Sequence, residues 1–229
     1  MTYRPRSPEE FWEDVRAHPE RTQQEFWEGL YAAHAEGERP AEATFLAAET
    51  AELTPGSALE LGCGEGGDAV LLAAQGWRVT GVDISQTAVD RATARAARAG
   101  VRDHTRFEAR DLSVDFPSGV FDLVSAQFLH SPFAAAGERE SILRRAADAV
   151  ASGGHLVVVS HAGPPSWAEG LPAGVTLPSA DENRAAVGTD AGVWETVRDE
   201  VVLTGLPDPE GRMGTRPDHV LHLRRRTTR

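Results

Sequence analysis

The sequence predicts an α/β fold with a mostly parallel sheet and helices on both of its faces. The first observation is a strict alternation of short apolar runs with helical segments between residues 57 and 161. The second is that the first apolar run leads directly into a glycine-rich stretch, residues 62–67, which opens a helix. Parallel strands need a long crossover connection, which a helix usually supplies. The alternation therefore indicates crossover units placed side by side.

The composition describes one domain of some size and excludes several kinds of site. The chain has 229 residues and a formal net charge of −12, and all 23 of its cationic residues are Arg. Without Lys, the chain has no phosphate-binding lysine, no Schiff-base lysine and no kinase lysine. Cys63 is the one cysteine, which excludes internal disulfides, Cys-rich zinc sites and iron–sulfur clusters.

The charge balance argues against nucleic acid as the main partner, because a phosphate backbone is held by clustered cations. One such cluster exists, at residues 224–229, and we expect it to be a solvated end. No apolar window is long enough to span a membrane, and the first residues lack the apolar core of a signal peptide. We therefore expect a cytoplasmic protein. No His/Cys cluster suggests a metal, and a monomer or a homodimer is equally compatible with the sequence.

Three helical stretches are predicted before the alternating region. Capping signals at Ser7 and Thr22 start the first two, and the third runs from residue 40 to residue 53. The second stretch carries Phe26, Trp27 and Tyr31 at helical spacing. These aromatic side chains form either a lid over a binding site or part of the core, and the sequence leaves both interpretations open.

The alternating region divides into predicted strands at 58–61, 77–82, 104–108, 121–125 and 155–160, with helices over 70–74, 85–99 and 142–150. After Pro164 the pattern loosens. A loop over 163–178 precedes a short helix capped by Ser179 and Glu182, and two β-like stretches follow at 193–203 and 218–224, separated by a polar loop over 205–217.

The strongest chemical signal is the run from Glu60 to Gly67, at a strand-to-helix junction. Glycines permit a tight turn and let a ligand approach the backbone, and the helix N-terminus offers free N–H donors. Read as Gly62, Gly64 and Gly67, the run also fits the dinucleotide-binding pattern. The loop alone does not choose between these ligands.

Two acidic residues follow the next two strands in register with the glycine loop. Asp83 lies 21 residues after Gly62 and ends the second strand, where a carboxylate can accept both hydroxyls of an adenosine ribose. Asp111 lies 28 residues further on and follows the third strand. An acid at that position is expected if it accepts the adenine amino group. The three features together indicate an adenosine-containing ligand.

With these residues in view, the chain from about residue 57 to residue 161 resembles a class I S-adenosylmethionine-dependent methyltransferase. The run at 76–85, GWRVTGVDIS, is typical of small bacterial methyltransferases in the broad group that includes tellurite- and thiopurine-resistance enzymes. The resemblance implies a Rossmann-like, doubly wound seven-stranded sheet whose terminal strand is antiparallel. The residues that match the family pattern are Glu60, Gly62, Gly64, Gly66, Asp83, Asp111 and the segment 125–132.

The resemblance also implies roles in binding the cofactor. Glu60 would orient the loop and the cofactor's amino group, and Gln127 would face the methionine moiety or the acceptor. Cys63 is interpreted as a small residue required by the space between glycines rather than as a reactive thiol. The remaining implied cofactor-binding residues are Gly62, Gly64 and Gly66 on the methionine and ribose portion, Asp83 on the ribose, and Ile84, Asp111 and Leu112 on the adenine.

His130 and His161 are the candidate acid–base residues, because both follow strands whose ends would form the floor of the pocket. A purely structural role for either is equally compatible with the sequence. The other histidines are not expected in the site: His18, His34, His219 and His222 are predicted to be solvated, and His104 and His155 to open strands on the far side of the sheet.

The resulting hypothesis is a methyltransferase that moves a methyl group from S-adenosylmethionine to a small-molecule acceptor by in-line displacement, with S-adenosylhomocysteine as product. A non-catalytic S-adenosylmethionine-binding sensor or partner protein and an NAD-dependent oxidoreductase are the alternatives. Residues 1–53 are expected to form a helical lid or cap, and 54–229 the methyltransferase domain. Within that domain, 57–161 would bind the cofactor and 162–229 would supply closing strands and a pocket loop.

Overall fold

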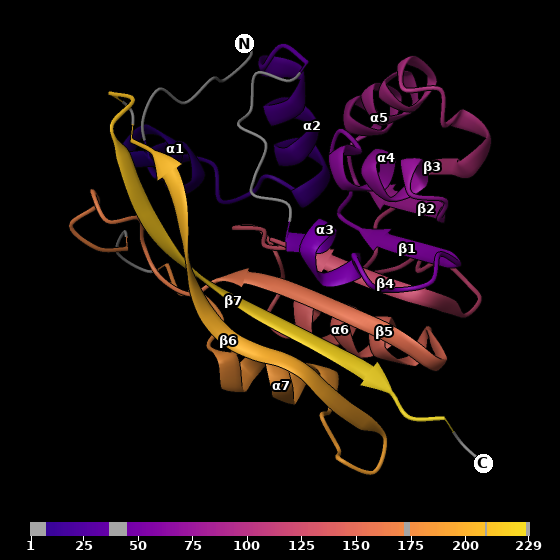
Figure 1. Ribbon diagram of the computed structural model, residues 1–229. Helices are drawn as coiled ribbons and strands as arrows, with labels where there is room; N and C mark the ends of the chain where they lie inside the picture. Colours follow the sequence, from indigo (N-terminus) through magenta and orange to yellow (C-terminus); the bar gives the residue numbers. More distant parts are fainter. Residues whose placement is uncertain (1–7, 37–44, 172–174, 209, 228–229) are drawn as a thin grey trace.

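The computed structural model describes residues 8–36, 45–171, 175–208 and 210–227. Their centre is a seven-stranded sheet in the order β3-β2-β1-β4-β5-β7-β6 (Figure 1). The strands are β1 Ser57–Leu61, β2 Arg78–Asp83, β3 Thr105–Ala109, β4 Phe121–Gln127, β5 Val150–His161, β6 Trp194–Pro207 and β7 Met213–Arg225.

The strand directions confirm the predicted α/β class. Strands β1 to β5 pair in parallel, whereas β7 is antiparallel to both of its neighbours, β5 and β6. The order reverses between β1 and β4, because the chain builds outward to β3 and then returns to the other side of β1. Ligands of open α/β sheets bind at such a switch point, beyond the carboxyl ends of the strands.

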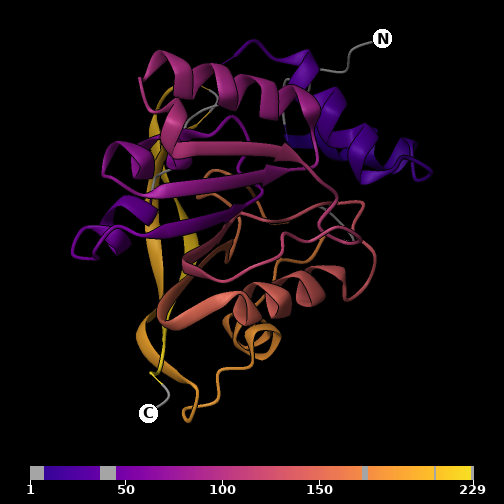
Figure 2. The ribbon, with the colours of Figure 1, turned by 90° about the vertical axis from the view of Figure 1, so that its right-hand side faces the viewer.

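Helices cover both faces of the sheet (Figure 2). Helices α3, α4 and α5 pack on one face, and α6 and α7 lie on the other. Thr22 and Ser179 cap α2 and α7 with capping boxes, and Ser85 caps α5, as the sequence predicts. The helices are α1 Pro8–Ala17, α2 Gln23–Ala33, α3 Phe45–Thr50, α4 Gly67–Ala74, α5 Gln86–Arg98, the short 3₁₀ turn Arg102–His104, α6 Glu138–Asp148 and α7 Ala180–Val187.

Successive side chains of a strand point to opposite faces of the sheet, so the core has two layers. In β4, Leu123 faces the layer under α3 to α5, and the next residue, Val124, faces the layer under α6 and α7. Val157 and Val158 divide in the same way in β5. Central strands buried on both faces read as continuous apolar runs, which is why HLVVVS was recognisable as a strand.

Strand β5 begins earlier than predicted, and α6 ends earlier. The sequence placed Val150 on a helix and Gly153 and Gly154 in the turn after it. In the structure α6 ends at Asp148, and Val150 pairs with Phe121 of β4. The pairing register then shifts before Leu123, and Gly153 adopts a φ of 78°. The glycines thus belong to an irregular strand start rather than to a helix stop.

The final hairpin is also longer than predicted. The polar stretch interpreted as a loop over 205–217 is strand on both sides of a short turn near Asp208, whose carboxylate accepts hydrogen bonds from the backbone of Glu210 and Arg212. The hairpin runs past the parallel strands (Figure 1), so polar residues face solvent there. The arginine cluster begins within β7, which extends to Arg225; the side chains of Arg224 and Arg226 are exposed, as predicted, and Arg225 is half-buried. Residues 228–229 lie outside the described part of the chain.

The N-terminal prediction is confirmed in part. The third helix covers Phe45–Thr50 and does not reach Leu53, while the predicted Ser7 cap and residues 40–44 lie outside the described residues. Within the described part of the chain, no helix combines the length and apolar character needed to cross a membrane.

Candidate functional site

The glycine loop after β1 is held against the end of β2. The backbone N–H groups of Gly62 and Cys63 both donate to the carbonyl of Val82, at 2.8 and 2.9 Å. Gly64 has a φ of 52°, in the left-handed region that favours glycine. A Cβ on Gly64 would lie 2.8 Å from the Tyr31 hydroxyl oxygen. The left-handed backbone and the close approach of Tyr31 together explain why residue 64 is a glycine.

Asp83 connects this loop to the start of α5. Its Oδ2 accepts the N–H of Gly64 at 2.9 Å, and its Oδ1 accepts the N–H of Ser85 at 3.0 Å. The side chain is almost fully buried. The predicted ribose-binding acid thus lies against the glycine loop, at the carboxyl end of β2.

Asp111 occupies the corresponding position after β3. Its Oδ1 accepts the backbone N–H of Ser113 at 2.8 Å. The backbone N–H of the preceding residue, Arg110, donates to the carbonyl of Asp83 at 2.8 Å. Leu112 is buried in the core, and Ile84 is half-buried. The carboxyl ends of β2 and β3 therefore bring the expected adenosine-binding residues together.

A second group of acceptors gathers where α4 begins. Glu60, in β1, accepts the backbone N–H of Ala69. Gln127, at the end of β4, donates its Nε2 to Oδ2 of Asp68 at 2.5 Å. One oxygen of each side chain is sealed from solvent without a hydrogen-bond partner: Oε2 of Glu60, Oδ1 of Asp68 and Oε1 of Gln127.

The charges and burial of Glu60, Asp68 and Gln127 favour the binding of a cationic hydrogen-bond donor. Burial raises the pKa of Glu60 well above its usual value, and the charges of Asp68 and Asp83 raise it further. Burial also raises the pKa of Asp68. Buried acceptor atoms left without donors are costly. A positively charged hydrogen-bond donor would satisfy them and lower both pKa values.

The turn after β4 folds back over the glycine loop. Phe128 has a φ of 51°, which is unusual for a non-glycine residue. A Cβ on Gly62 would lie 2.9 Å from Cδ1 of Leu129. Gln127 is the last residue of β4 rather than the first beyond it. The turn thus places Leu129 beside Gly62, in the glycine loop that follows β1.

The two candidate histidines lie next to each other, with ring centroids 5.3 Å apart. The backbone N–H of His161 donates to Nε2 of His130 at 3.3 Å. Burial, and then the charge of Arg139, lowers the pKa of His130 to about 3. His130 is therefore neutral at physiological pH and a weak base.

His161 has a different environment, because it contacts a carboxylate. Its Nδ1 lies 3.0 Å from Oδ1 of the fully buried Asp218. Asp218 also accepts hydrogen bonds from Thr204 at 2.5 Å and from Arg216 at 2.9 and 3.2 Å. Burial raises the pKa of Asp218, but the hydrogen bonds from His161, Arg216 and Thr204 bring it below its ordinary value. An ionised Asp218 favours the His161 tautomer that donates from Nδ1.

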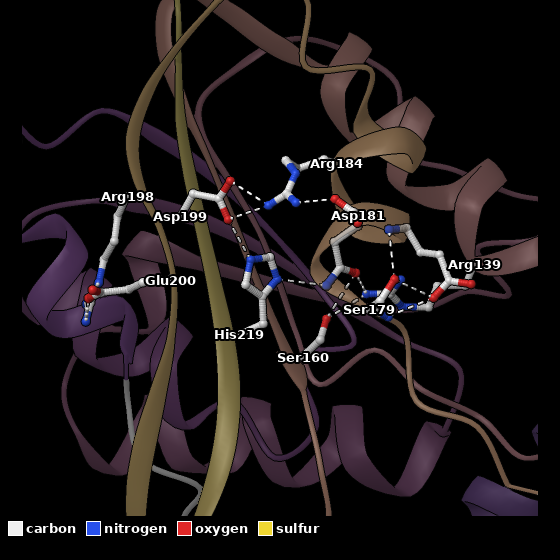
Figure 3. A network of polar contacts seen from close by, with 11 residues as sticks. Arg139, Ser160, Ser179, Asp181, Arg184, Arg198, Asp199, Glu200 and His219 are labelled. Carbon is white, nitrogen blue, oxygen red and sulfur yellow. Dashed lines mark hydrogen bonds and ion pairs between the residues drawn. The ribbon is translucent and has the colours of Figure 1, made fainter.

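A buried polar network, shown in Figure 3, joins this region to the outer strand β6. Arg139 donates to the carbonyl of Leu129 at 3.1 Å and to the side chains of Ser160 and Asn183, both at 2.8 Å. Asn183 contacts His219, and His219 contacts Asp199 on β6 at 2.8 Å. The network fixes the turn after β4, because Arg139 binds its backbone directly.

The prediction that His219 and His222 are solvated was wrong. Both side chains are buried, facing opposite sides of β7. His222 contacts Glu49 of α3 and His155 of β5, each at 2.8 Å. Buried polar side chains need hydrogen-bond partners. The partners of these two histidines come from segments that are distant in the sequence, so residue spacing does not reveal them.

Helix α2 covers the glycine loop from the N-terminal side. Besides the Tyr31 contact with Gly64, its Phe26 ring lies 5.1 Å from Phe133, in the segment after β4. Phe26 and Tyr31 are buried. Phe26 and Tyr31 therefore pack as part of the core, as one of the two interpretations expects, and a lid over a bound ligand stays a prediction.

Cys63 is buried, and its Sγ lies 3.0 Å from the position of a Cβ on Gly81. Burial, followed by the charges of Asp83 and Glu60, raises the pKa of its thiol well above the usual value. A thiol that stays protonated is a poor nucleophile. Among the described residues, no group of three or more His, Cys, Asp or Glu side chains is placed to hold a metal ion.

Comparison with known proteins favours a methyltransferase. Residues 58–154 match the sequence profile of a family described as "Methyltransferase domain". This segment of the chain is therefore similar to methyltransferase domains. The match covers β1 to the start of β5, the segment that holds the glycine loop and both strand-end acids. It favours the methyltransferase over the oxidoreductase interpretation of the loop.

A curated relative is similar to part of the chain. The 27-O-demethylrifamycin SV methyltransferase of Amycolatopsis mediterranei (strain S699) is 36% identical over 104 residues, which is 44% of this chain and 36% of that protein. The chain therefore aligns with little more than a third of the length of this relative. The similarity does not extend to the whole of either protein.

Solved structures show the same fold over most of the chain. A structure described as "Conversion of a Disulfide Bond into a Thioacetal Group during Echinomycin Biosynthesis" has a TM-score of 0.68 at 23% identity, covering 90% of this chain and 94% of that one. The N-methyltransferase NodS from Bradyrhizobium japonicum WM9, in complex with S-adenosylhomocysteine, has a TM-score of 0.60 at 17% identity, covering 93% and 97%.

Proposed function

We propose that the protein transfers a methyl group from S-adenosylmethionine to a small-molecule acceptor. The observation that carries this proposal is the set of unpaired, buried oxygens on Glu60, Asp68 and Gln127, close to the loop held by Asp83. These acceptors suit the ammonium group of the cofactor's methionine portion. A dinucleotide would bring anionic phosphates to a place where buried carboxylates already repel one another.

The remaining predicted residues suit the rest of the cofactor. The backbone of Gly62, Cys63, Gly64 and Gly66 would line its methionine and ribose portion, and Asp83 would accept the ribose hydroxyls. Ile84 and Leu112 would pack on the adenine, and Asp111 would accept its amino group. When bound, the cofactor supplies an activated methyl group on a sulfonium, so the chain has only to bind, orient and exclude water.

The base in this proposal is His161 rather than His130. Asp218 holds the Nδ1–H of His161, so Nε2 is free to accept the proton that an oxygen or nitrogen acceptor loses. His130 has a pKa of about 3, so at neutral pH it serves as a hydrogen-bonding neighbour that accepts the N–H of His161. Asp218 is a positioning residue for this base.

A small acceptor is supported by two observations. Phe26 of α2 packs on Phe133 of the segment after β4, and Tyr31 and Leu129 of the same two segments lie close to the glycine loop. Such a cover over the loop would favour a small acceptor. The name of the curated relative, a 27-O-demethylrifamycin SV methyltransferase, also describes a small-molecule acceptor. Residues 1–53 would then act as the lid of this site.

The direct test incubates the protein with methyl-labelled S-adenosylmethionine and a small-molecule extract and identifies labelled products. We expect label in one or a few small molecules, and no transfer by an Asp83→Ala variant. Tight cofactor binding without any labelled product would instead support a non-catalytic binding protein. Label found only in macromolecules of an unfractionated extract would contradict the small-molecule acceptor.

A further inference from the structure

Helix α2 is tied to α5 by a single carboxylate. Oε2 of Glu28 accepts the hydroxyl of Ser85 at 2.7 Å and the backbone N–H of Thr87 at 3.1 Å. Its Oε1 accepts the hydroxyl of Thr87. Both carboxylate oxygens are thus bound by the cap and first turn of one helix, although Glu28 is nearly 60 residues away in the sequence.

This is a favourable place for a negative charge. The first N–H groups of a helix have no partners within the helix, and the helix dipole adds positive potential. Burial raises the pKa of Glu28, but the hydrogen bonds from Ser85 and Thr87 outweigh it and the pKa is lowered overall. Glu28 is therefore ionised at neutral pH, and the contact is a charge-assisted one.

The same contact is continuous with the proposed ribose site. Ser85, which donates its hydroxyl to Glu28, also donates its backbone N–H to Oδ1 of Asp83. The other oxygen of Asp83 accepts the N–H of Gly64. Tyr31, one helical turn after Glu28, covers that glycine. Helix α2 therefore contacts both segments that Asp83 holds together.

Other contacts hold the ends of α2 against the same site. Gln23 donates to Oε1 of Glu138 at 2.5 Å, and Phe26 packs on Phe133. Beyond the other end of the helix, Arg91 of α5 donates to the carbonyl of His34 at 2.9 Å. Glu28 lies between these ends, and Ser85 joins it to Asp83.

We propose that Glu28 is a positioning residue for cofactor binding: it fixes the Asp83–Ser85 turn and holds α2 closed over the glycine loop. The inference rests on the proposed function, because it takes the cofactor to bind at Asp83. In this account Glu28 does not touch the cofactor. Removing its carboxylate changes neither the association rate of the ligand nor the folding of the sheet. It releases helix α2 from the glycine loop, so that bound ligand dissociates faster.

The experiment measures S-adenosylhomocysteine binding to the full-length chain by stopped-flow tryptophan fluorescence and calorimetry. Trp27 lies on α2, next to Glu28, and a Trp27→Phe variant assigns its part of the signal. Glu28→Gln removes the charge and one acceptor. Glu20→Gln is the matched control, because Glu20 is exposed and carries the same charge.

We expect Glu28→Gln to raise the dissociation rate about tenfold to a hundredfold, the range for losing hydrogen bonds to a charged group. The association rate and the Glu20→Gln variant should stay close to wild type. Thr87→Val, which removes one donor at the other side of the contact, should act in the same direction. In the double variant the two effects should not add, because both changes remove the same contact.

Two results would overturn the inference. Dissociation rates of Glu28→Gln and Thr87→Val within twofold of wild type would show that the contact does not hold the ligand. Fully additive effects would show that Glu28 acts elsewhere. Should Glu28→Gln not fold, Thr87→Val alone decides by the same criterion. If the wild-type chain binds no S-adenosylhomocysteine at all, the proposed function fails first, and that outcome is distinct from normal binding with unchanged variants.

Discussion

Nδ1 of His161 lies 3.0 Å from a carboxylate oxygen of Asp218, whereas the neighbouring His130 accepts the backbone N–H of His161 and has no carboxylate partner within the described residues. The two histidines follow strands in the same way in the sequence, yet their surroundings differ. The buried carboxylate of Asp218 orients one imidazole, while burial beside cations disfavours the protonated form of the other.

This difference predicts unequal effects of substitution on catalysis. His161→Gln should lower kcat by about a hundredfold or more, within the range for losing a general base. Asp218→Asn should lower kcat less, because His161 keeps its ring and loses only the carboxylate that orients it. His130→Gln should lower kcat less than His161→Gln does, because the neutral His130 is a weak base. Steady-state kinetics with the acceptor found by labelling would check this, and equal losses for both histidines would contradict it.

The same burial predicts a loss of stability in acid. An unfolded His takes up a proton as pH falls through about 6.5, but the folded His130 does so only near its pKa of about 3. The unfolded state therefore binds more protons over this interval, and stability present above pH 6.5 is lost as pH falls. His155, with its pKa lowered by burial to about 4, and His222 act in the same direction.

Denaturant unfolding at pH 7 and pH 5 measures this effect. For His130 alone we expect the free energy of unfolding to fall by about 2 kcal/mol at pH 5. A His130→Gln variant should show a pH dependence smaller by roughly that amount. An unfolding free energy that stays constant across this interval would contradict the burial of neutral histidines.

The unpaired acceptors predict how cofactor binding depends on pH. An ammonium group needs Asp68 ionised, and burial raises the pKa of Asp68, so the free protein takes up this proton at a higher pH than an ordinary aspartate does. Affinity for S-adenosylhomocysteine should therefore rise as the pH rises through this raised pKa. Asp68→Asn should weaken binding at pH 8 about tenfold or more and flatten the pH dependence.

Calorimetry of both proteins checks this prediction. Asp103→Asn is a suitable control, because Asp103 is exposed and lies in the turn before β3, at the amino end of that strand. A pH dependence that Asp68→Asn leaves unchanged would assign the ammonium group to other residues.

A substitution at Gly64 tests how closely Tyr31 of α2 covers the glycine loop. A Cβ on Gly64 would approach the Tyr31 hydroxyl to 2.8 Å and would also occupy a left-handed conformation. Gly64→Ala should lower Tm and S-adenosylhomocysteine affinity, and Tyr31→Phe in the same chain should restore part of the loss. Gly29→Ala is the control, because it meets nothing within 4 Å and replaces a helix-interior glycine. It should leave Tm unchanged or higher.

The segment from residue 57 to residue 161 was well predicted, because the residues that form each of its features lie close together in the sequence. A glycine loop after a strand and an acid at the end of the next strand, such as Asp83, lie on one continuous stretch whose geometry the βαβ unit imposes. The start of β5 was misplaced for the opposite reason. Val150 is apolar and follows a helix, and only its pairing with Phe121 shows that it belongs to the strand.

The acceptor half was less predictable, because its contacts join distant segments. Asp218, Arg139 and Glu28 carry no local pattern that distinguishes them from other charged residues. Their partners His161, Asn183 and Ser85 lie 57, 44 and 57 residues away in the sequence. His219 and His222 looked solvated because their burial depends on Asn183 and Glu49, which come from two different helices. Long-range polar partners emerge only when the sheet is assembled.

Calorimetric titration of the wild-type chain and of Asp83→Ala with S-adenosylhomocysteine tests the central claim most directly. The account predicts one site per chain for the wild type and a loss of affinity of tenfold or more for Asp83→Ala, with the variant still folded by circular dichroism. Absence of binding by the wild type at millimolar ligand, or equal affinity of the two proteins, would contradict it.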